Sequence, residues 1–340
     1  MLPKLVLIAL SAAAVLAQTA QPAPQASPIP APIQVHVSEV IVPVTVTDEK
    51  DRFVSNLTAG DFKIFDEGRE QNFRYFTHEA HQPVVVGFLI DLSNTNRLHW
   101  KTYQEAAIDL VTNLMPGNDK RFSGYLVGYS NEAELQVNTT TDPEKIVDRI
   151  RKMKPGGGAA MFDGIYLACT RRDLVKGEPI EPRRVLVIIG DGHDNASRKN
   201  LLEVLEIAQR NLVTIYGVST VAYGFTSEGS ENLDRLTLET GGRVEYPLQN
   251  LYKDVSGYLS TPSDEGNYAY KVGTGGYAAE VASGMFKAIA AVAGEVTTQY
   301  ILRYTPSDTD VPRRFRNIRV EVKLPNVKVR ARKGYYPFAP

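Results

Sequence analysis

The hydrophobic pattern of the chain changes near residue 84. From there to about residue 250, short apolar runs alternate with stretches in which apolar residues recur at helical spacing. The runs predict strands at 84–90, 122–129, 133–137, 184–190 and 212–219, and the periodic stretches predict helices at 98–114, 142–153, 160–173, 199–210 and 229–240. This alternation predicts a doubly wound α/β fold, in which helices cover both faces of a mainly parallel sheet.

Both ends of the chain carry a different pattern. Residues 34–80 alternate apolar and polar positions, as antiparallel strands do. The same alternation returns at 299–340, after a weakly periodic loop or insertion at 251–276 and a helical pattern at 277–298. Because two short β segments are not stable alone, we expect the N- and C-terminal strands to form one β-sandwich. The α/β domain, at 83–250, would then be inserted between the two halves of the sandwich.

The helical pattern near the C-terminus predicts which of its faces is buried. Val281, Phe286, Ile289 and Val292 fall on one side of a helix over 277–298. We expect this apolar stripe to pack against the rest of the protein.

The first 33 residues resemble a targeting segment followed by a linker. Lys4 precedes a short apolar run that ends at Val15-Leu16-Ala17, small residues of the kind found before a signal-peptidase cut. The run is too short for a comfortable membrane span. We therefore predict a signal peptide over 1–17, a disordered Pro- and Ala-rich spacer over 18–33 and a secreted or periplasmic protein. Only an uncleaved signal would leave the chain attached to a membrane.

The composition excludes several classes of partner. The 340 residues include 38 Lys and Arg against 39 Asp and Glu, and the formal net charge is −1. No overall field would therefore draw the protein to nucleic acid or to an anionic membrane. Cys169 is the only cysteine, so an internal disulfide is excluded. Recognition of a partner must come from a local site.

Polar side chains stand where two of the predicted strands end. The run "VVVGFLIDLSNT" leads from apolar residues to Asp91, Ser93 and Thr95, and "RRVLVIIGDG" leads to Asp191. Sheets of this kind bind ligands outside the carboxyl ends of their strands, and the glycine loop "PGGGAAMFDG" belongs to the same edge. Carboxylate and hydroxyl oxygens suit Mg²⁺, or Mn²⁺ or Ca²⁺, better than softer metals. The sequence therefore predicts that these four residues form a divalent metal site.

These motifs resemble the von Willebrand factor A domain. The metal ion-dependent adhesion site of that family uses an Asp-x-Ser-x-Ser motif, a distant Thr and a distant Asp. Asp91, Ser93 and Thr95 match the first motif, with Thr in place of the last Ser, and Asp191 matches the distant Asp. Counting along the glycine loop without a gap places Ala159 where the family has Thr. The resemblance therefore implies a metal site that lacks one oxygen ligand and binds its ion weakly.

The resemblance extends beyond this domain. The segments "VPVTVTDEKDRFVSNLTAGDFKIFDEGREQNF", "ETGGRVEYP", "QYILRYTP" and "RNIRVEVKLPNVKVRARKGYYPF" look like a bacterial family of exported proteins that is related to von Willebrand A domains and abundant in acidobacteria. No catalysed reaction comes with this resemblance. It implies a non-enzymatic binding or adhesion protein, in which the metal ion recognises a protein partner. An acidic side chain of that partner would complete the coordination of the ion.

Three other interpretations remain open. Asp91 and Ser93 could only cap the following helix, because both side chains accept hydrogen bonds from free N–H groups. The domain could also bind its partner without a metal. Finally, phosphotransferases of the haloacid dehalogenase type use an Asp-x-Asp-x-Thr motif and a later acidic loop that binds Mg²⁺. In that case Asp91 would be the nucleophile and Asp191 a metal ligand, but Ser93 would stand where the reaction needs a general acid.

Overall fold

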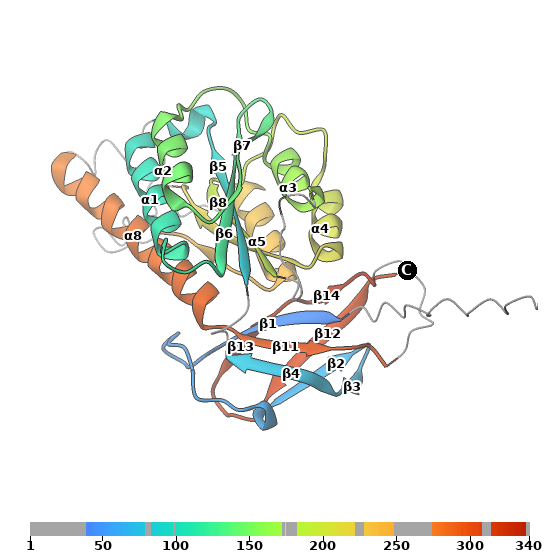
Figure 1. The fold of residues 1–340 in the computed structure, drawn as a ribbon. Helices are drawn as coiled ribbons and strands as arrows, with labels where there is room; N and C mark the ends of the chain where they lie inside the picture. The colour runs from blue at the N-terminus through green and yellow to red at the C-terminus, as the bar shows by residue number, and fades with distance from the viewer. Residues whose placement is uncertain are drawn as a thin grey trace, which may run out of the picture. The chain divides into compact units, whose positions relative to one another are not determined.

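The computed structural model describes most of the chain after the predicted spacer. The described residues are 39–78, 83–97, 99–171, 174, 182–221, 228–247, 274–307 and 314–337. The predicted signal peptide, the spacer and nearly all of the 251–276 segment lie outside these ranges. The described residues form an α/β unit and a β-sandwich (Figure 1).

In the described residues, six strands form the sheet of the α/β unit, in the order β10-β9-β8-β5-β6-β7. They are β5 (Val84–Asp91), β6 (Phe122–Tyr129), β7 (Ala133–Thr140), β8 (Arg183–Gly190), β9 (Val213–Ser219) and β10 (Val244–Glu245). β6 and β7 pair antiparallel, and the other neighbours pair in parallel. Every residue of β5 is buried, as expected for a strand that is covered on both faces.

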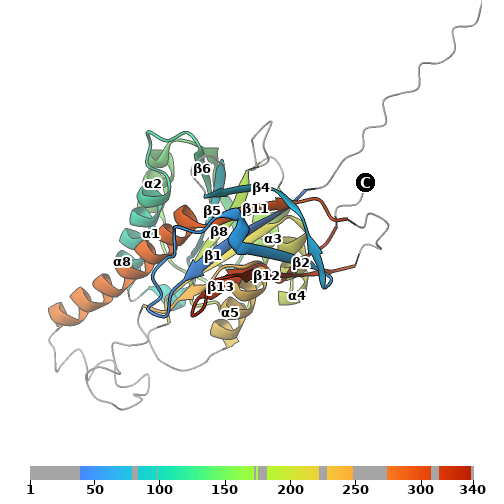
Figure 2. The same ribbon diagram turned by 90° about the horizontal axis from the view of Figure 1, so that it is seen from below.

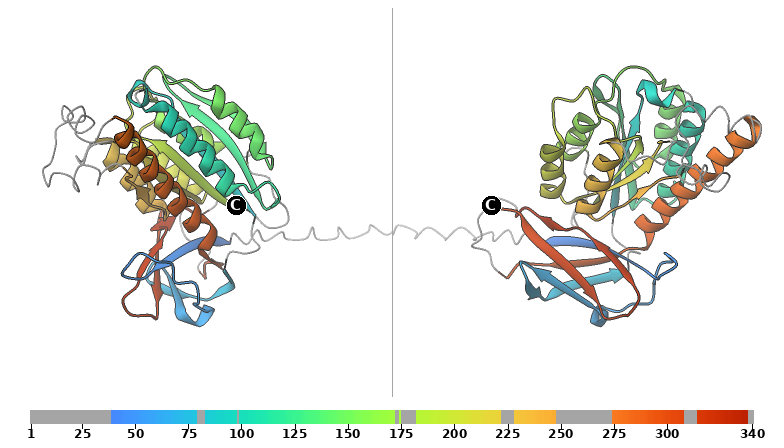
Figure 3. Two further views of the ribbon diagram at one scale, coloured as in Figure 1. Left: turned by 90° about the vertical axis from the view of Figure 1, so that its left-hand side faces the viewer. Right: turned by 180° about the vertical axis from the view of Figure 1, so that it is seen from behind.

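Helices cover both faces of this sheet (Figure 3). One face carries α1 (Trp100–Leu114), α2 (Pro143–Lys152) and α8 (Thr274–Thr298), and the other carries α3 (Met161–Thr170), α4 (Leu201–Arg210) and α5 (Glu228–Thr240). The prediction of a doubly wound α/β fold is therefore confirmed. Within the described ranges, no helix combines the length and the hydrophobicity that a membrane span requires.

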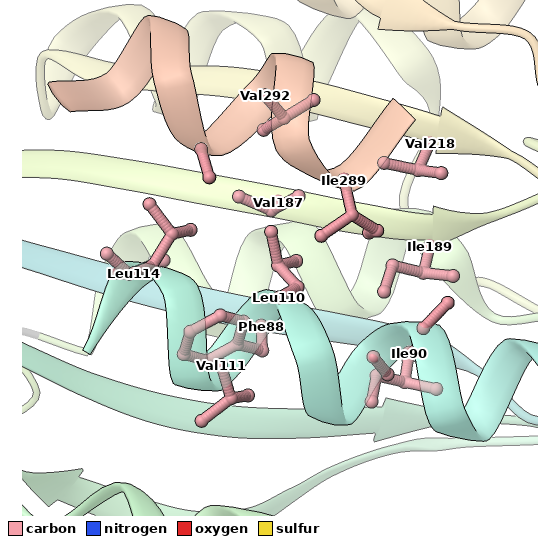
Figure 4. Packing of buried hydrophobic residues seen from close by; sticks show 14 of the residues in the cluster. Phe88, Ile90, Leu110, Val111, Leu114, Val187, Ile189, Val218, Ile289 and Val292 are labelled. Atoms are coloured by element: carbon pink, nitrogen blue, oxygen red, sulfur yellow. The ribbon is translucent and has the colours of Figure 1, made fainter. Parts of the chain in front are cut away.

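The core beneath α1 and α8 shows how the helices are held to the sheet (Figure 4). Leu110 of α1 and Ile289 of α8 pack over Phe88 of β5 and Val187 of β8, and each of these side chains is at most 1% exposed. Burying an apolar side chain of this size stabilises the fold by roughly 1.5–3 kcal/mol. The C-terminal helix is thus part of the core of the α/β unit.

The buried stripe of α8 differs from the predicted stripe at one position. Val281, Ile289 and Val292 are buried as expected, but Phe286 is 41% exposed. Met285 takes its place and is fully buried in the same core. The reason is the helical period, since Met285 follows Val281 by one turn and precedes Ile289 by another.

The two ends of the chain form the sandwich together. One sheet has the order β13-β1-β11-β4 and the other has the order β14-β12-β2-β3. The N-terminal segment supplies β1 (Val40–Thr47), η1 (Ala59–Asp61), β2 (Phe62–Asp66), β3 (Arg69–Gln71) and β4 (Phe73–His78); the C-terminal segment supplies β11 (Tyr300–Tyr304), β12 (Arg316–Val322), β13 (Lys328–Ala331) and β14 (Gly334–Tyr335). In Figure 2, blue strands accordingly lie beside red and orange ones. The prediction of a shared sandwich is confirmed.

A buried polar cluster joins α8 to the sandwich. The Glu295 side chain is fully buried, and its Oε1 accepts a hydrogen bond of 2.9 Å from Thr45 Oγ1 on β1. Its Oε2 forms ion pairs with Arg243 at 3.0 Å and with Arg330 of β13 at 2.6 Å. Because a buried carboxylate is tolerated only with such partners, this cluster fixes the end of α8 to the sandwich.

Candidate metal centre

Asp91 and Asp191 lie on neighbouring strands at one edge of the sheet. β5 and β8 are parallel neighbours, with Ile90 opposite Ile189. Asp91 is the last residue of β5, and Asp191 directly follows β8. The charge of Asp191 is near enough to raise the pKa of Asp91. The structure thus brings these two sequence-predicted carboxylates together.

Ser93 and Thr95 form a pair of hydroxyl groups in the turn after β5, where a short 3-10 helix, η2, covers Asn94–Asn96. Ser93 Oγ and Thr95 Oγ1 are 2.7 Å apart. The backbone N–H of Ser93 donates to Asp91 Oδ1 at 2.7 Å, and Asn96 Nδ2 donates to the backbone oxygen of Asp91 at 3.2 Å. The carboxylate of Asp91 therefore shapes the turn that carries both hydroxyls.

The structure does not support helix capping as the role of this motif. α1 begins at Trp100, and its N-cap residue is His99. Ser93 is the N-cap residue of η2, but its side chain makes no capping hydrogen bond. The positions of Asp91 and Ser93 therefore need another explanation.

The Asp91 carboxylate is buried and only partly satisfied. The residue is 1% exposed, and its Oδ2 has no hydrogen-bond partner among the described residues. Burial, and after it the charge of Asp191, raises the pKa of Asp91 from its ordinary value of 3.8 to about 6, although hydrogen bonds from Ser93 and Asn96 act in the opposite direction. A cation at this place would give Oδ2 a partner and offset the repulsion between the two carboxylates.

The donor set fits a hard divalent ion. Two carboxylates and two hydroxyls are the ligand types that Mg²⁺, Mn²⁺ and Ca²⁺ prefer. The described part of the chain contains no group of three or more His, Cys, Asp or Glu that could hold a metal. An ion at Asp91 and Asp191 would therefore depend on Ser93, Thr95 and water for its remaining ligands.

The glycine loop is tied to the turn after β5. The N–H of Gly156 donates to Leu92 O at 2.6 Å, and the N–H of Asn94 donates to Gly157 O at 3.1 Å. Gly157 has a φ of 98°, and a Cβ at this position would lie 2.9 Å from Asn131 Oδ1. Glycine is favoured here because an L side chain would be strained at this φ. The loop is thereby fixed beside the Asp91 turn.

Ala159, which the sequence resemblance places where the family has Thr, offers the site no side-chain oxygen. It is 2% exposed and belongs to the apolar core under α3 and α4. Its N–H donates to Asn195 Oδ1 at 2.8 Å, and its carbonyl oxygen accepts from the N–H groups of Asn195 and Ala196. The backbone at Ala159 is therefore held by the loop that also carries Asp191.

Two further carboxylates, Asp163 and Asp194, join α3 to the loop after β8. Asp194 Oδ2 accepts a hydrogen bond from the N–H of Phe162, at the start of α3, at 2.8 Å. In the other direction, Asp163 of α3 accepts from the N–H groups of Arg198 and Lys199. From the sequence, Asp163 could either orient the site or, as an acid in the first turn of a helix, only favour the helix dipole. The pair keeps the glycine loop and the Asp191 loop together.

The comparison with protein families agrees with this architecture. The family model of the von Willebrand factor type A domain matches residues 86–253. Among solved structures, the von Willebrand factor type A protein from Catenulispora acidiphila is 12% identical, over 74% of this chain and 51% of that chain, with a TM-score of 0.40. The proximal thread matrix protein 1 from the mussel byssus, with a zinc-occupied MIDAS motif, is 15% identical over 50% of this chain and 43% of that chain, with a TM-score of 0.38.

A third similar structure is that of three N-terminal domains of the type V pili tip protein Mfa5 from Porphyromonas gingivalis, at 18% identity over 46% of this chain, with a TM-score of 0.30. The chain spans only 27% of that structure. No curated protein matches the chain. The matched residues 86–253 contain all but the first two residues of the six-stranded sheet and also Asp91, Ser93, Thr95 and Asp191. The chain therefore carries a von Willebrand factor type A domain over residues 86–253.

Proposed function

We propose that this chain is an exported, non-enzymatic binding protein that recognises a protein partner through a divalent ion held by Asp91, Ser93, Thr95 and Asp191. The single observation that carries the proposal is that the Asp91 carboxylate is 1% exposed and lies beside a second carboxylate, Asp191, at the same edge of the sheet. The ion would supply a local positive charge that a chain of net charge −1 lacks. An acidic side chain of the partner is the chemistry that such a charge attracts.

Export is the second part of the proposal, and it is supported by the sequence alone. The apolar run that ends at Val15-Leu16-Ala17 has the form of a signal peptide. The mature protein would then begin at Gln18 and be secreted or periplasmic. Sequencing the N-terminus of the exported protein tests this directly, and an intact Met1 in a membrane fraction would contradict it.

A binding role fits this domain better than phosphoryl transfer. Von Willebrand factor A domains are in general interaction modules rather than enzymes. In addition, Ser93 occupies the place where a phosphotransferase of the haloacid dehalogenase type needs a general acid, and a hydroxyl does not release its proton near neutral pH. The hydroxyl of Ser93 instead pairs with that of Thr95.

Titration calorimetry with Mg²⁺ and Mn²⁺ tests the metal-dependent function. We expect weak binding by the wild type and none by Asp91→Ala, because the site loses one of its two carboxylates. Asp148→Ala is the control, since Asp148 is an exposed acid of α2 that is ion-paired to Arg151. Binding should be unchanged in this variant. A wild type that binds neither ion would reject the metal-dependent function and leave a partner surface that works without metal.

Ala159→Thr tests the missing ligand. A hydroxyl at this position should tighten Mg²⁺ binding about fivefold, which corresponds to roughly 1 kcal/mol for one added contact. Ala159→Val has nearly the same shape without the oxygen, so it separates the effect of the ligand from the effect of the larger side chain. Equal affinities in the Thr and Val variants would show that this position lies outside the coordination sphere.

A further inference from the structure

A buried tyrosine lies at the same level of the sheet as Asp91. Tyr129 is the last residue of β6 and stands opposite Asp91 of β5 in the parallel pairing. The N–H of Leu92 donates to the backbone oxygen of Tyr129 at 2.8 Å, so the two strand ends are fixed to each other. The Tyr129 side chain is fully buried in the core under α3 and α4.

The Tyr129 hydroxyl reaches the space between Asp91 and β8. Gly190 is the last residue of β8, and a Cβ added to it would collide with the Tyr129 hydroxyl oxygen and lie 3.1 Å from Asp91 Oδ2. The hydroxyl and the carboxylate oxygen therefore both face the bare Cα of Gly190. Glycine at this position leaves the room that the two oxygens share.

Both oxygens are buried, and neither makes a hydrogen bond of normal geometry with the described residues, although an interaction of hydrogen-bond type with Asp91 contributes to the raised pKa of Tyr129. Such orphaned groups are rare in native proteins, and each one calls for an explanation. Here the two groups are complementary, because a phenol at neutral pH is a donor and an ionised carboxylate only accepts. Adjacent burial of one unused donor and one unused acceptor indicates that they serve each other.

We propose that Tyr129 is a positioning residue of the metal centre, whose hydroxyl donates to Asp91 Oδ2 and fixes the orientation of this carboxylate toward the ion. The inference rests on the proposed function. A carboxylate oxygen has two lone pairs, so Oδ2 can accept from the hydroxyl and still face an ion or a water on the ion. Because Ala159 supplies no oxygen, the orientation of each remaining ligand weighs more in the affinity. Groups that orient metal ligands in this way typically change metal affinity 10- to 100-fold.

Tyr129→Phe tests the role of the hydroxyl, because it removes one oxygen and keeps the buried ring. We expect the affinity for Mn²⁺ and Mg²⁺, measured by titration calorimetry, to fall about 10- to 100-fold. In chelator, the free energy of unfolding in urea should stay equal or rise, because an unpaired buried hydroxyl costs more than its absence. A purely structural role would move the free energy of unfolding and not the affinity.

Tyr125→Phe is the matched control. Tyr125 lies on the same strand and in the same apolar core, but its hydroxyl donates to the backbone oxygen of Ala168 at 3.3 Å. This variant should lose stability and keep the metal affinity of the wild type. Equal affinities of Tyr129→Phe and the wild type would overturn the role of Tyr129 and leave the proposed function standing. An equal loss of affinity in both variants would show general loosening of the core and also overturn it. A wild type without metal binding would overturn the proposed function and this role together.

Discussion

Asp91 destabilises the metal-free protein at neutral pH. Its pKa of about 6 in the folded chain lies above the ordinary value of 3.8, first because of burial and then because of Asp191. Keeping this carboxylate ionised at pH 7 therefore costs on the order of 3 kcal/mol relative to the unfolded chain. Such a cost at one residue is common at functional sites and uncommon elsewhere.

The raised pKa of Asp91 predicts that the free energy of unfolding depends on pH. Between about pH 4 and 6, Asp91 is protonated in the folded state but ionised in the unfolded chain. Its contribution to the free energy of unfolding is therefore full below about pH 4 and is lost as the pH rises to about 6. In the presence of a chelator, the free energy of unfolding of Asp91→Asn should therefore exceed that of the wild type by roughly 1–3 kcal/mol at about pH 7. The difference should shrink toward about pH 4. Urea unfolding of both proteins across this range measures it. A difference that does not change with pH would contradict the raised pKa.

At the scale of the elements, the alternation of apolar runs and helical periods was enough to predict the α/β unit. β5 and β8 are apolar until their last residues, and parallel pairing then places Asp91 and Asp191 at one edge. The supporting residues were not predictable, because their partners come from distant parts of the chain. The Tyr129 hydroxyl, for example, lies near Asp91 only because Gly190 has no side chain to fill the space between them.

The prediction that Phe286 of α8 is buried was wrong for a different reason. The segment contains apolar residues at both 285 and 286, so two stripes one residue apart fit the pattern. Only the packing against α1 and the sheet decides between them, and it selects Met285. Periodicity predicts that a helix has a buried face, but neighbouring apolar residues leave the orientation of that face open.

The orientation of α8 can be tested by a pair of substitutions. Met285→Ala should lower the free energy of unfolding by about 2–5 kcal/mol, because it opens a cavity in the core under α1 and α8. Phe286→Ala should cost less than about 1 kcal/mol, because this side chain is partly exposed and lies outside that core. Urea unfolding of the two variants and the wild type gives both values. A larger effect at Phe286 would mean that the helix buries the face that the sequence pattern indicated.

At the scale of the whole molecule, the sandwich makes the two ends of the chain depend on each other. β1 lies between β11 and β13, and β2 lies between β12 and β3. The N-terminal strands therefore obtain most of their backbone hydrogen bonds from strands that follow the A domain. Glu295 adds a buried connection, because it binds Thr45 of β1 and Arg330 of β13 at the end of α8.

This dependence predicts the behaviour of truncated chains. A chain that ends at residue 298 keeps β1, β2 and α8 but loses β11, β12 and β13, so it should aggregate through the unpaired edges of its N-terminal strands. The matched control is a chain over 83–298, which loses both halves of the sandwich and keeps α8. It has no orphaned sandwich strands, so light scattering at equal concentration should show much less aggregation. If the truncated chain that keeps the N-terminal strands stays monomeric and unfolds cooperatively, these strands do not need the C-terminal ones. The sandwich would then not be the shared unit that its strand order implies.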